Sequence, residues 1–139
     1  MSKLSQYDWR WRNVRIGKTQ LTIAQFGCYL LDLCMLKNLD PRKINKLFTE
    51  KGGYTADGLI NNERAYRLIG LTYLGKTTTN PKELCIGTTN YYATKAQPDM
   101  RHFFVLKPDQ TIVDSLTGKA GFNKYAYDMV SYRLFKYGV

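Results

Sequence analysis

The pattern of apolar residues in the sequence changes near residue 70, and this change limits the folds that the chain can adopt. Before it, apolar residues recur with the spacing of amphipathic helices, whereas beyond it short β-branched and aromatic runs alternate with turn residues. The 139 residues, 44% of them hydrophobic, suit one globular domain with an adequate core. We therefore expect a single α+β domain over residues 1–139, with N-terminal helices packed on a C-terminal antiparallel sheet and residues 1–18 as an N-terminal arm.

Three helices are expected in the first half of the chain. Residues 23–36 are apolar nearly all round, which predicts a buried central helix, and Thr22 to Gln25 match a capping box at its start. The segment DPRKINKLFTEKGG has a proline at a helix start and two glycines at its end. The segment GLINNERAYRLIG repeats this pattern and ends at Gly70. The apolar face of this third helix would consist of Leu59, Ile60, Tyr66 and Ile69.

The second half contains four runs typical of strands: LTYL, HFFVL, TIVDSL and MVSYRLF. The runs HFFVL and TIVDS flank the turn sequence KPDQ and predict a hairpin. A three-residue loop at 107–109 would pair His102 directly with Asp114 and place both side chains on one face. A four-residue loop would instead send Asp114 to the opposite face, so the arrangement depends on the loop length.

The chain is strongly basic, with 21 Lys and Arg against 11 Asp and Glu. A formal charge of +10 favours anionic partners such as nucleic acid, teichoic acid or lipid head groups. The basic residues are scattered, however, which is typical of an ordinary solvated surface. The segment YDWRWRNVR interleaves cations with Trp9 and Trp11, as single-stranded nucleic-acid binders do, but we expect the two tryptophans to hold the arm against the core.

Compartment and cofactor use follow from the N-terminus and the cysteines. The first residues contain no apolar segment of signal-peptide length, and the longest apolar stretch, interrupted by Asp32, is too short to span a bilayer. We expect a soluble protein, made in the cytoplasm without a signal peptide and not inserted into a membrane. Three cysteines without a CxxC pair and a single histidine give no zinc spacing, so we expect free thiols and no metal or cofactor.

The residues that could carry chemistry are one cysteine, the histidine and an aspartate. His102 oriented by Asp114 would form an imidazole–carboxylate pair, which needs a nucleophile to complete it. Cys28 suits this role, because the front of a helix lowers the pKa of a thiol and Gly27 would let a substrate backbone approach. Cys34, deeper in the same helix, and Cys85, with no acid or helix start beside it, are interpreted as packing residues.

The order of helix-borne Cys, strand-borne His and Asp at the end of the next strand resembles that of the papain-like cysteine peptidases. The closer likeness is to bacterial and phage domains related to the bacteriocin-leader (double-glycine) peptidases. Four segments carry it: TIAQFGCYL around Cys28, DPRKINKLFTEKGGYTADGLI after it, HFFVL for His102 and IVDSLTG for Asp114. The likeness covers most of residues 9–135.

The resemblance implies a thiol hydrolase in which Cys28 attacks an amide carbonyl, His102 acts as base and then acid, and Asp114 orients His102. Such domains usually carry an oxyanion-hole glutamine six residues before the cysteine, where this chain has Thr22. Gln25 is therefore the candidate by proximity, with helix capping as its other role. The chain also reads DSLTG where such domains commonly have Asp-Pro, which leaves the loop after Asp114 undefined.

Free-standing domains of this type often belong to phage lysins and tail proteins that cut peptide cross-links of the cell wall. The resemblance thus favours a peptide or peptidoglycan cross-link as substrate, in the host cytoplasm or the virion of a phage. The charge of +10 would favour adsorption to anionic cell-wall polymer. Two other functions stay open: an inactive papain-like domain serving as a binding or virion structural module, and a basic nucleic-acid-binding protein. The second lacks any helix-turn-helix, RNP or zinc-finger signature.

Overall fold

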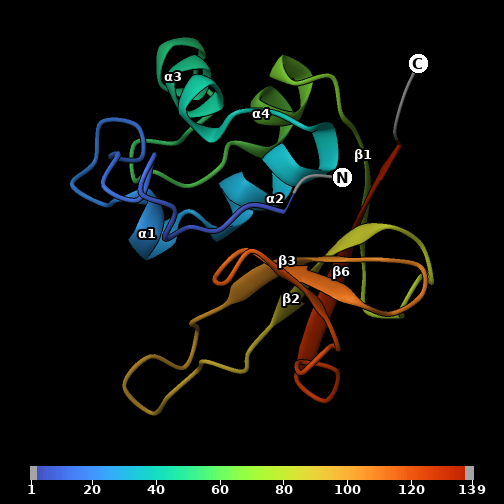
Figure 1. Ribbon diagram of the computed structural model, residues 1–139. Helices are drawn as coiled ribbons and strands as arrows, with labels where there is room; N and C mark the ends of the chain where they lie inside the picture. Colours follow the sequence, from blue (N-terminus) through green and yellow to red (C-terminus); the bar gives the residue numbers. More distant parts are fainter. Residues whose placement is uncertain (1–2, 137–139) are drawn as a thin grey trace.

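Four helices precede six strands along the chain, as Figure 1 shows for the computed structural model, which describes residues 3–136. The helices are α1 (Ile23–Phe26), α2 (Cys28–Lys37), α3 (Pro41–Lys51) and α4 (Asn62–Leu68). The strands are β1 (Thr72–Thr77), β2 (Cys85–Thr89), β3 (His102–Leu106), β4 (Ile112–Asp114), β5 (Lys119–Gly121) and β6 (Met129–Lys136). The expected α+β class is confirmed, with helices first and an antiparallel sheet second. Residues 1–2 of the predicted N-terminal arm lie outside the described range.

The expected central helix is in fact two helices that meet at Gly27. The capping box forms as predicted, because the backbone N–H of Thr22 donates to Gln25 Oε1 at 3.0 Å, but α1 ends after one turn. A Cβ at residue 27 would lie only 2.6 Å from the carbonyl oxygen of Ile23. Glycine is therefore required by packing inside the protein, and the break makes Cys28 the first residue of α2.

The third predicted helix is shorter than expected. It begins at Asn62, so Leu59 and Ile60 lie before it, and Leu59 is 67% exposed. The assignment of Leu59 to a buried helix face is therefore wrong, because the chain before Asn62 forms a loop. The remaining positions of that face behave as predicted, since Tyr66 and Ile69 are both buried.

The sheet has the order β1-β6-β2-β3-β4-β5, with every pair antiparallel. Two of its strands, β2 and β5, carry no signal in the sequence. All of β2 is buried, so it shows no alternation of polar and apolar residues. At its centre, a Cβ on Gly87 would lie 2.9 Å from the side chains of Phe104 and Met129, so a glycine fits where a strand-forming residue would not.

The predicted hairpin between β3 and β4 forms with a different register. Val105 pairs with Val113 and Leu106 with Ile112, so His102 and Asp114 are not direct partners as expected. The register is displaced by two residues, because the turn is longer and closes with Lys107 N–H donating to the Thr111 carbonyl at 2.9 Å. A displacement by two preserves the alternation of side chains, so both residues still face the same side of the sheet.

Alternate residues of β3 contact different parts of the core. Phe103 and Val105 face the helices, where the larger hydrophobic cluster contains most of α2 together with Phe48 and Tyr66. Phe104 and Leu106 face the other side, where they pack with Tyr125 and Tyr132. The strand that begins with His102 is therefore buried on both faces, and its first residue is held at the end of a rigid element.

The N-terminal arm packs against this core through only one of its two tryptophans. Trp11 is buried, and its indole N–H donates to the carbonyl of Ser5 at 2.7 Å. Trp9 is 79% exposed, so the expectation that both tryptophans hold the arm is wrong for Trp9. The guanidinium of Arg10 lies 4.5 Å from the ring of Trp11 and is paired with Asp8.

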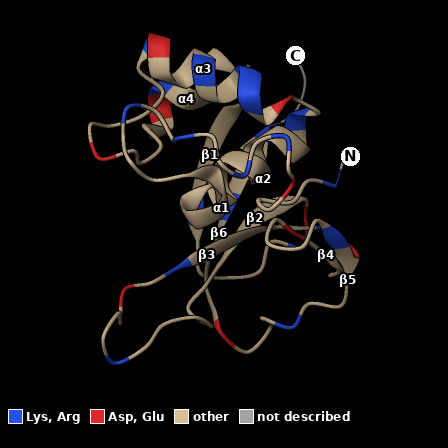
Figure 2. Cartoon of the chain, turned by 60° about the vertical axis from the view of Figure 1, so that its left-hand side comes forward, with Lys and Arg blue, Asp and Glu red and all other residues tan. Residues whose placement is uncertain are grey.

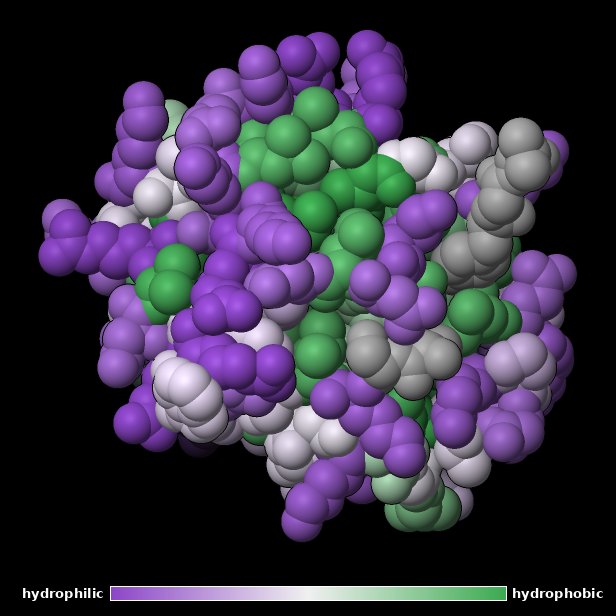
Figure 3. All heavy atoms as spheres, turned by 45° about the horizontal axis from the view of Figure 1, so that its top comes forward, coloured by the Kyte–Doolittle hydropathy of each residue, from purple (hydrophilic) through white to green (hydrophobic). Residues whose placement is uncertain are grey.

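The molecular surface is mixed in character. Figure 2 shows lysines and arginines spread over helices, loops and strands, with acidic residues among them. Figure 3 shows a hydrophobic area at the helical end of the molecule, surrounded by hydrophilic side chains. Within residues 3–136, none of the helices has both the length and the apolar character needed to cross a bilayer.

Candidate functional site

A cavity of about 740 Å³ brings the predicted nucleophile and base to the same place. It is bordered by the junction of α1 and α2, the start of β3, the loop before α4 and the N-terminal arm. Cys28, His102 and Gln25 all line it, whereas Asp114 lies behind His102. Exposed side chains of Tyr7, Phe26 and Leu59 form much of its apolar rim. Leu59, which the sequence pattern assigned to a buried helix face, thus borders the cavity instead.

His102 and Asp114 form a direct hydrogen bond. His102 Nε2 lies 2.8 Å from Asp114 Oδ1, and both side chains are almost completely buried. The bond is made across the displaced register described above, between residues that face the same side of β3 and β4. Within the described part of the chain, His102 Nδ1 has no hydrogen-bond partner, and the residue lines the cavity.

Asp114 is surrounded by donors that keep it ionised. Burial opposes its ionisation, but hydrogen bonds from His102, Tyr125 and the backbone N–H of Leu116 together lower the pKa of its carboxyl group. Lys124 Nζ lies 3.9 Å from its second oxygen. Because an ionised carboxylate only accepts, His102 Nε2 must donate, and the neutral imidazole then presents Nδ1 as an acceptor. This is the tautomer that a general base requires.

Two tyrosines complete the surroundings of His102, and no sequence pattern pointed to either of them. The hydroxyl of Tyr125 donates to Asp114 Oδ2, and the hydroxyls of Tyr92 and Tyr125 lie 2.9 Å apart. Both rings meet the imidazole edge-on, each with its centroid 5.6 Å from that of His102. They fix the ring orientation of His102. No motif marks them, because the chain contains 11 tyrosines and these two are distant in sequence.

Cys28 is half-buried at the first position of α2, and it is a free thiol. Burial and then the charge of Asp32 raise its pKa to about 12, while the backbone N–H groups of Phe103 and Tyr29 offset this in part. The expectation that the helix front lowers this pKa is therefore wrong for the resting site. The thiol and His102 line the same cavity, but among the described residues no hydrogen bond joins them.

Asp32 is an unusual neighbour for a nucleophile. It follows Cys28 by one helical turn on α2 and is completely buried. Within residues 3–136, neither of its oxygens has a hydrogen-bond partner of ordinary geometry. Burial and then the charge of Asp114 raise its pKa well above the usual range, and the nearby Ser115 offsets only part of this effect. The pKa of Asp32 is thus shifted in the direction that favours the protonated carboxylic acid.

Two glutamines border the cavity, and their amides are engaged differently. Gln25 Oε1 accepts from Thr22, so its capping role is observed, and its side-chain NH₂ is the group left to donate to an oxyanion. Gln6 is buried, and its NH₂ donates to the carbonyls of Ile23 and Ala24 at 3.2 and 3.3 Å. Gln6 therefore ties the arm to α1. Proximity to Cys28 in the sequence pointed only to Gln25, because Gln6 is distant along the chain.

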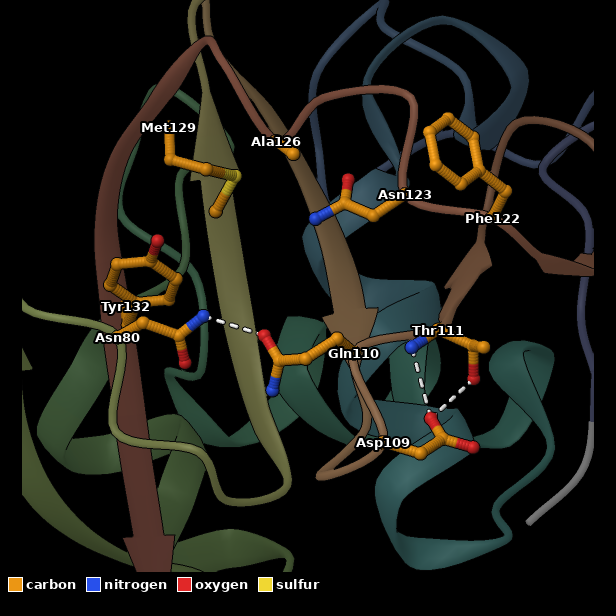
Figure 4. A pocket seen from close by; sticks show the side chains of 9 residues that line it. All are labelled: Asn80, Asp109, Gln110, Thr111, Phe122, Asn123, Ala126, Met129 and Tyr132. Carbon is orange, nitrogen blue, oxygen red and sulfur yellow. Dashed lines mark hydrogen bonds between the residues drawn. The ribbon is translucent and has the colours of Figure 1, made fainter.

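A second, smaller hollow lies away from these residues. Figure 4 shows this space of about 360 Å³ beside β6 and the β3–β4 turn. Its polar side chains largely satisfy one another, since Asn80 donates to Gln110 at 2.6 Å and Thr111 donates to Asp109. It contains no cysteine or histidine.

The other two cysteines are buried free thiols, as expected for packing residues. Within the described range, no three His, Cys, Asp or Glu side chains are grouped as metal ligands. Comparison of the chain with known protein families, with characterised proteins and with solved structures returns no match. The site must therefore be interpreted from its own geometry.

Proposed function

We propose that the chain is a cysteine-dependent hydrolase of peptide or amide bonds, with Cys28 as nucleophile, His102 as base and acid, and Asp114 as the group that orients His102. The observation that carries this proposal is the buried 2.8 Å bond between His102 and Asp114 at the wall of the cavity that Cys28 also lines. A buried imidazole held by an ionised carboxylate, together with a thiol that lines the same cavity, supplies the groups that nucleophilic catalysis needs.

The reaction proceeds through a thioester. His102 Nδ1 takes the thiol proton of Cys28 as Sγ bonds to the amide carbon, and the carbonyl oxygen becomes an oxyanion. The C–N bond then breaks, and the amine leaves with the proton from His102. Water next attacks the thioester as His102 takes one of its protons, the acid is released, and Cys28 regains its proton. One amide and one water thus give one acid and one amine, and Gln25 is the proposed donor to the oxyanion.

The raised pKa of Cys28 defines the first step more closely. A thiol with a pKa near 12 is protonated at neutral pH, so no thiolate–imidazolium pair is stored at rest. His102 therefore acts as a general base during the attack. This mechanism is closer to that of a serine hydrolase than to that of papain-like enzymes, which the sequence resembles.

The raised pKa of Cys28 also supports a second candidate, which is an inactive domain of papain-like type that binds a partner or forms part of a virion. A protonated thiol next to a buried carboxyl group would be a poor nucleophile if His102 could not reach it. The two candidates differ in one property, which is whether Cys28 can be acylated. Nucleic-acid binding has less support, because Trp11 is buried and Arg10 is paired with Asp8.

The first experiment is acylation with p-nitrophenyl acetate, followed by intact mass measurement and peptide mapping. The hydrolase should release p-nitrophenolate in a burst and carry one acetyl group on Cys28. Cys28→Ala should remove the burst, and His102→Ala should slow it by about 10²-fold or more. Cys85→Ala is the matched control for losing a thiol. A folded wild-type chain that shows no acetyl group on Cys28 would leave the inactive module as the function.

For the substrate we propose a peptide cross-link of the bacterial cell wall, on the basis of the resemblance to free-standing phage domains. The charge of +10 supports adsorption to anionic wall polymer. Purified peptidoglycan should release new free amines with the wild-type chain and none with Cys28→Ala. If Cys28 is acylated by the ester but no amines appear, the hydrolase stands and this substrate class fails.

A further inference from the structure

Arg133 places a positive charge in the wall of the cavity that contains Cys28 and His102. It lies on β6, and its guanidinium carbon is 5.1 Å from the ring centroid of Tyr29 and 4.9 Å from that of Phe103. These two rings also contact each other edge-to-face, with centroids 4.8 Å apart. Tyr29 follows Cys28 in the chain and Phe103 follows His102. The cation therefore rests on the two side chains adjacent to the reacting residues.

Among the described residues, no acidic side chain pairs with this charge. Within residues 3–136, no carboxylate forms an ion pair with Arg133, and its Nε–H is buried without a hydrogen-bond partner. The acidic residues that line the cavity, Asp57 and Asp99, are both exposed and make no ion pair with it. The two rings compensate part of the cost by cation–π contact, but a buried donor without an acceptor is destabilising.

We infer that Arg133 is a subsite for a carboxylate group of the substrate. That this carboxylate belongs to a substrate rests on the proposed function, whereas the binding of a carboxylate by Arg133 does not. A guanidinium binds a carboxylate through two parallel N–H donors, and this planar ligand suits a cation confined between two rings. Arg101, the other arginine of the cavity, already donates to the carbonyls of Pro98 and Met100.

A carboxylate at this place restricts the substrate. The peptide would carry a negative charge close to the scissile amide, either as its C-terminal carboxylate or as an acidic side chain. Both sources offer the same group to Arg133, and small probes separate them. N-acetylalanine against its amide tests the terminal carboxylate, and N-acetylglutamate α-amide against N-acetylglutamine amide tests the side chain.

The experiment observes the Nε–H resonance of Arg133 by ¹H–¹⁵N NMR, assigned by its loss in Arg133→Lys. The probes are titrated into Cys28→Ala, so that no turnover interferes. At least one acid should shift this resonance saturably and bind about tenfold tighter than its amide, as expected for a hydrogen bond to a charged group. The acid that does so identifies the source. Arg101→Gln, the matched control, should preserve the preference. Equal binding of acid and amide in both pairs, or no shift with any probe, would overturn the inference.

A second measurement uses Cys28 itself. The ratio of its alkylation rates with iodoacetate and iodoacetamide should fall several-fold in Arg133→Gln and less in Arg133→Lys, which keeps the charge. An unchanged ratio in both folded variants would contradict the inference. If p-nitrophenyl acetate leaves Cys28 unmodified while the NMR preference for acids is present, the carboxylate subsite stands and the hydrolase fails.

Discussion

The site has two halves, the imidazole half of His102 with Asp114 and the thiol half of Cys28, and they differ in how well their surroundings support the reacting group. The imidazole half is complete, because Asp114 accepts from three donors and the ring of His102 is enclosed by Tyr92 and Tyr125. In the thiol half the surroundings disfavour the thiolate, since burial and the charge of Asp32 raise the pKa of Cys28 to about 12. The imidazole of His102 is held in a fixed orientation at rest, whereas the thiol of Cys28 is not in its reactive thiolate form.

This difference indicates where the reaction begins. A base whose tautomer and orientation are fixed can remove a proton from a neutral thiol at the moment of attack. The cost of forming the thiolate is then met in the transition state and not in the resting protein. A protonated thiol is also less susceptible to oxidation than a stored thiolate, because the thiolate is the reactive species.

The largest effect should come from breaking the complete half. His102→Ala removes the only base and should slow acylation of Cys28 by p-nitrophenyl acetate by about 10²- to 10⁴-fold. Asp114→Asn should reduce it less, because an orienting group is less indispensable than the base. The measurement is the burst rate in stopped-flow absorbance. Equal rates in wild type and His102→Ala would show that the imidazole half has no part in the attack.

The second effect concerns the carboxyl group beneath the thiol. The folded pKa of Asp32 is raised, so its contribution to stability is present below its unfolded pKa and is lost as the pH rises toward the folded value. Asp32→Asn cannot ionise and should therefore gain stability over wild type by up to about 1.4 kcal/mol per pH unit above about pH 4.

Urea unfolding of both proteins between acidic and neutral pH measures this gain. Asp99→Asn, on an exposed loop, is the matched control and should show no comparable trend. A difference between Asp32→Asn and wild type that stays constant across this range would mean that Asp32 is ionised in the folded protein. The raised pKa of Asp32 would then be refuted, although its charge would still oppose the thiolate of Cys28.

A smaller loss is expected when the complete half loses one donor. Tyr125→Phe removes the hydroxyl that donates to Asp114 and should cost about 1.5–3 kcal/mol of unfolding free energy at neutral pH. The lowered pKa of Asp114 contributes stability above its unfolded pKa, and that contribution is lost as the pH falls through the folded pKa. The deficit of the variant should accordingly shrink in acid. Tyr127→Phe, at a fully exposed tyrosine, should change nothing, and an equal loss there would refute the assignment.

The smallest effect concerns charges outside both halves. Adsorption to anionic wall polymer should weaken steeply above physiological salt, because exposed charges are screened. The buried bond between His102 and Asp114 is shielded from salt, so the acylation rate should change little in the same series. Co-sedimentation with purified walls measures the first quantity. Tighter and equally salt-sensitive binding to single-stranded nucleic acid would favour the nucleic-acid-binding function instead.

The sequence predicted the elements that carry the complete half. The β-branched and aromatic run HFFVL matches β3 residue for residue, and Asp114 shares the face of His102 although the turn is longer than expected. A shift of the strand register by two residues leaves each side chain on the same face of the sheet. The sequence pattern therefore could not distinguish the direct pairing of His102 with Asp114 from the observed pairing.

The surroundings of the thiol half could not be predicted in the same way. The break at Gly27 arises because a side chain at this position would collide with Ile23. Strand β2 could not be recognised in the sequence, because it is buried throughout and shows no alternation of polar and apolar residues. Asp32 looked like an interruption of an apolar run, because its burial depends on β3 and β4 packing over α2. Arg133 belongs to a run of strand residues, and only the folded sheet brings its charge to Tyr29 and Phe103. These features arise from tertiary packing.

The most direct test of the contrast between the halves is the pH dependence of Cys28 alkylation by iodoacetamide, followed by peptide mapping from about pH 5 to about pH 10. If the thiol is protonated at rest, the rate should keep rising through neutral pH and reach no plateau below about pH 8. In Asp32→Asn the same rise should move to lower pH, because the opposing carboxyl group is gone. A plateau already present between about pH 5 and about pH 7 in the wild-type chain would show a stored thiolate–imidazolium pair and contradict the account.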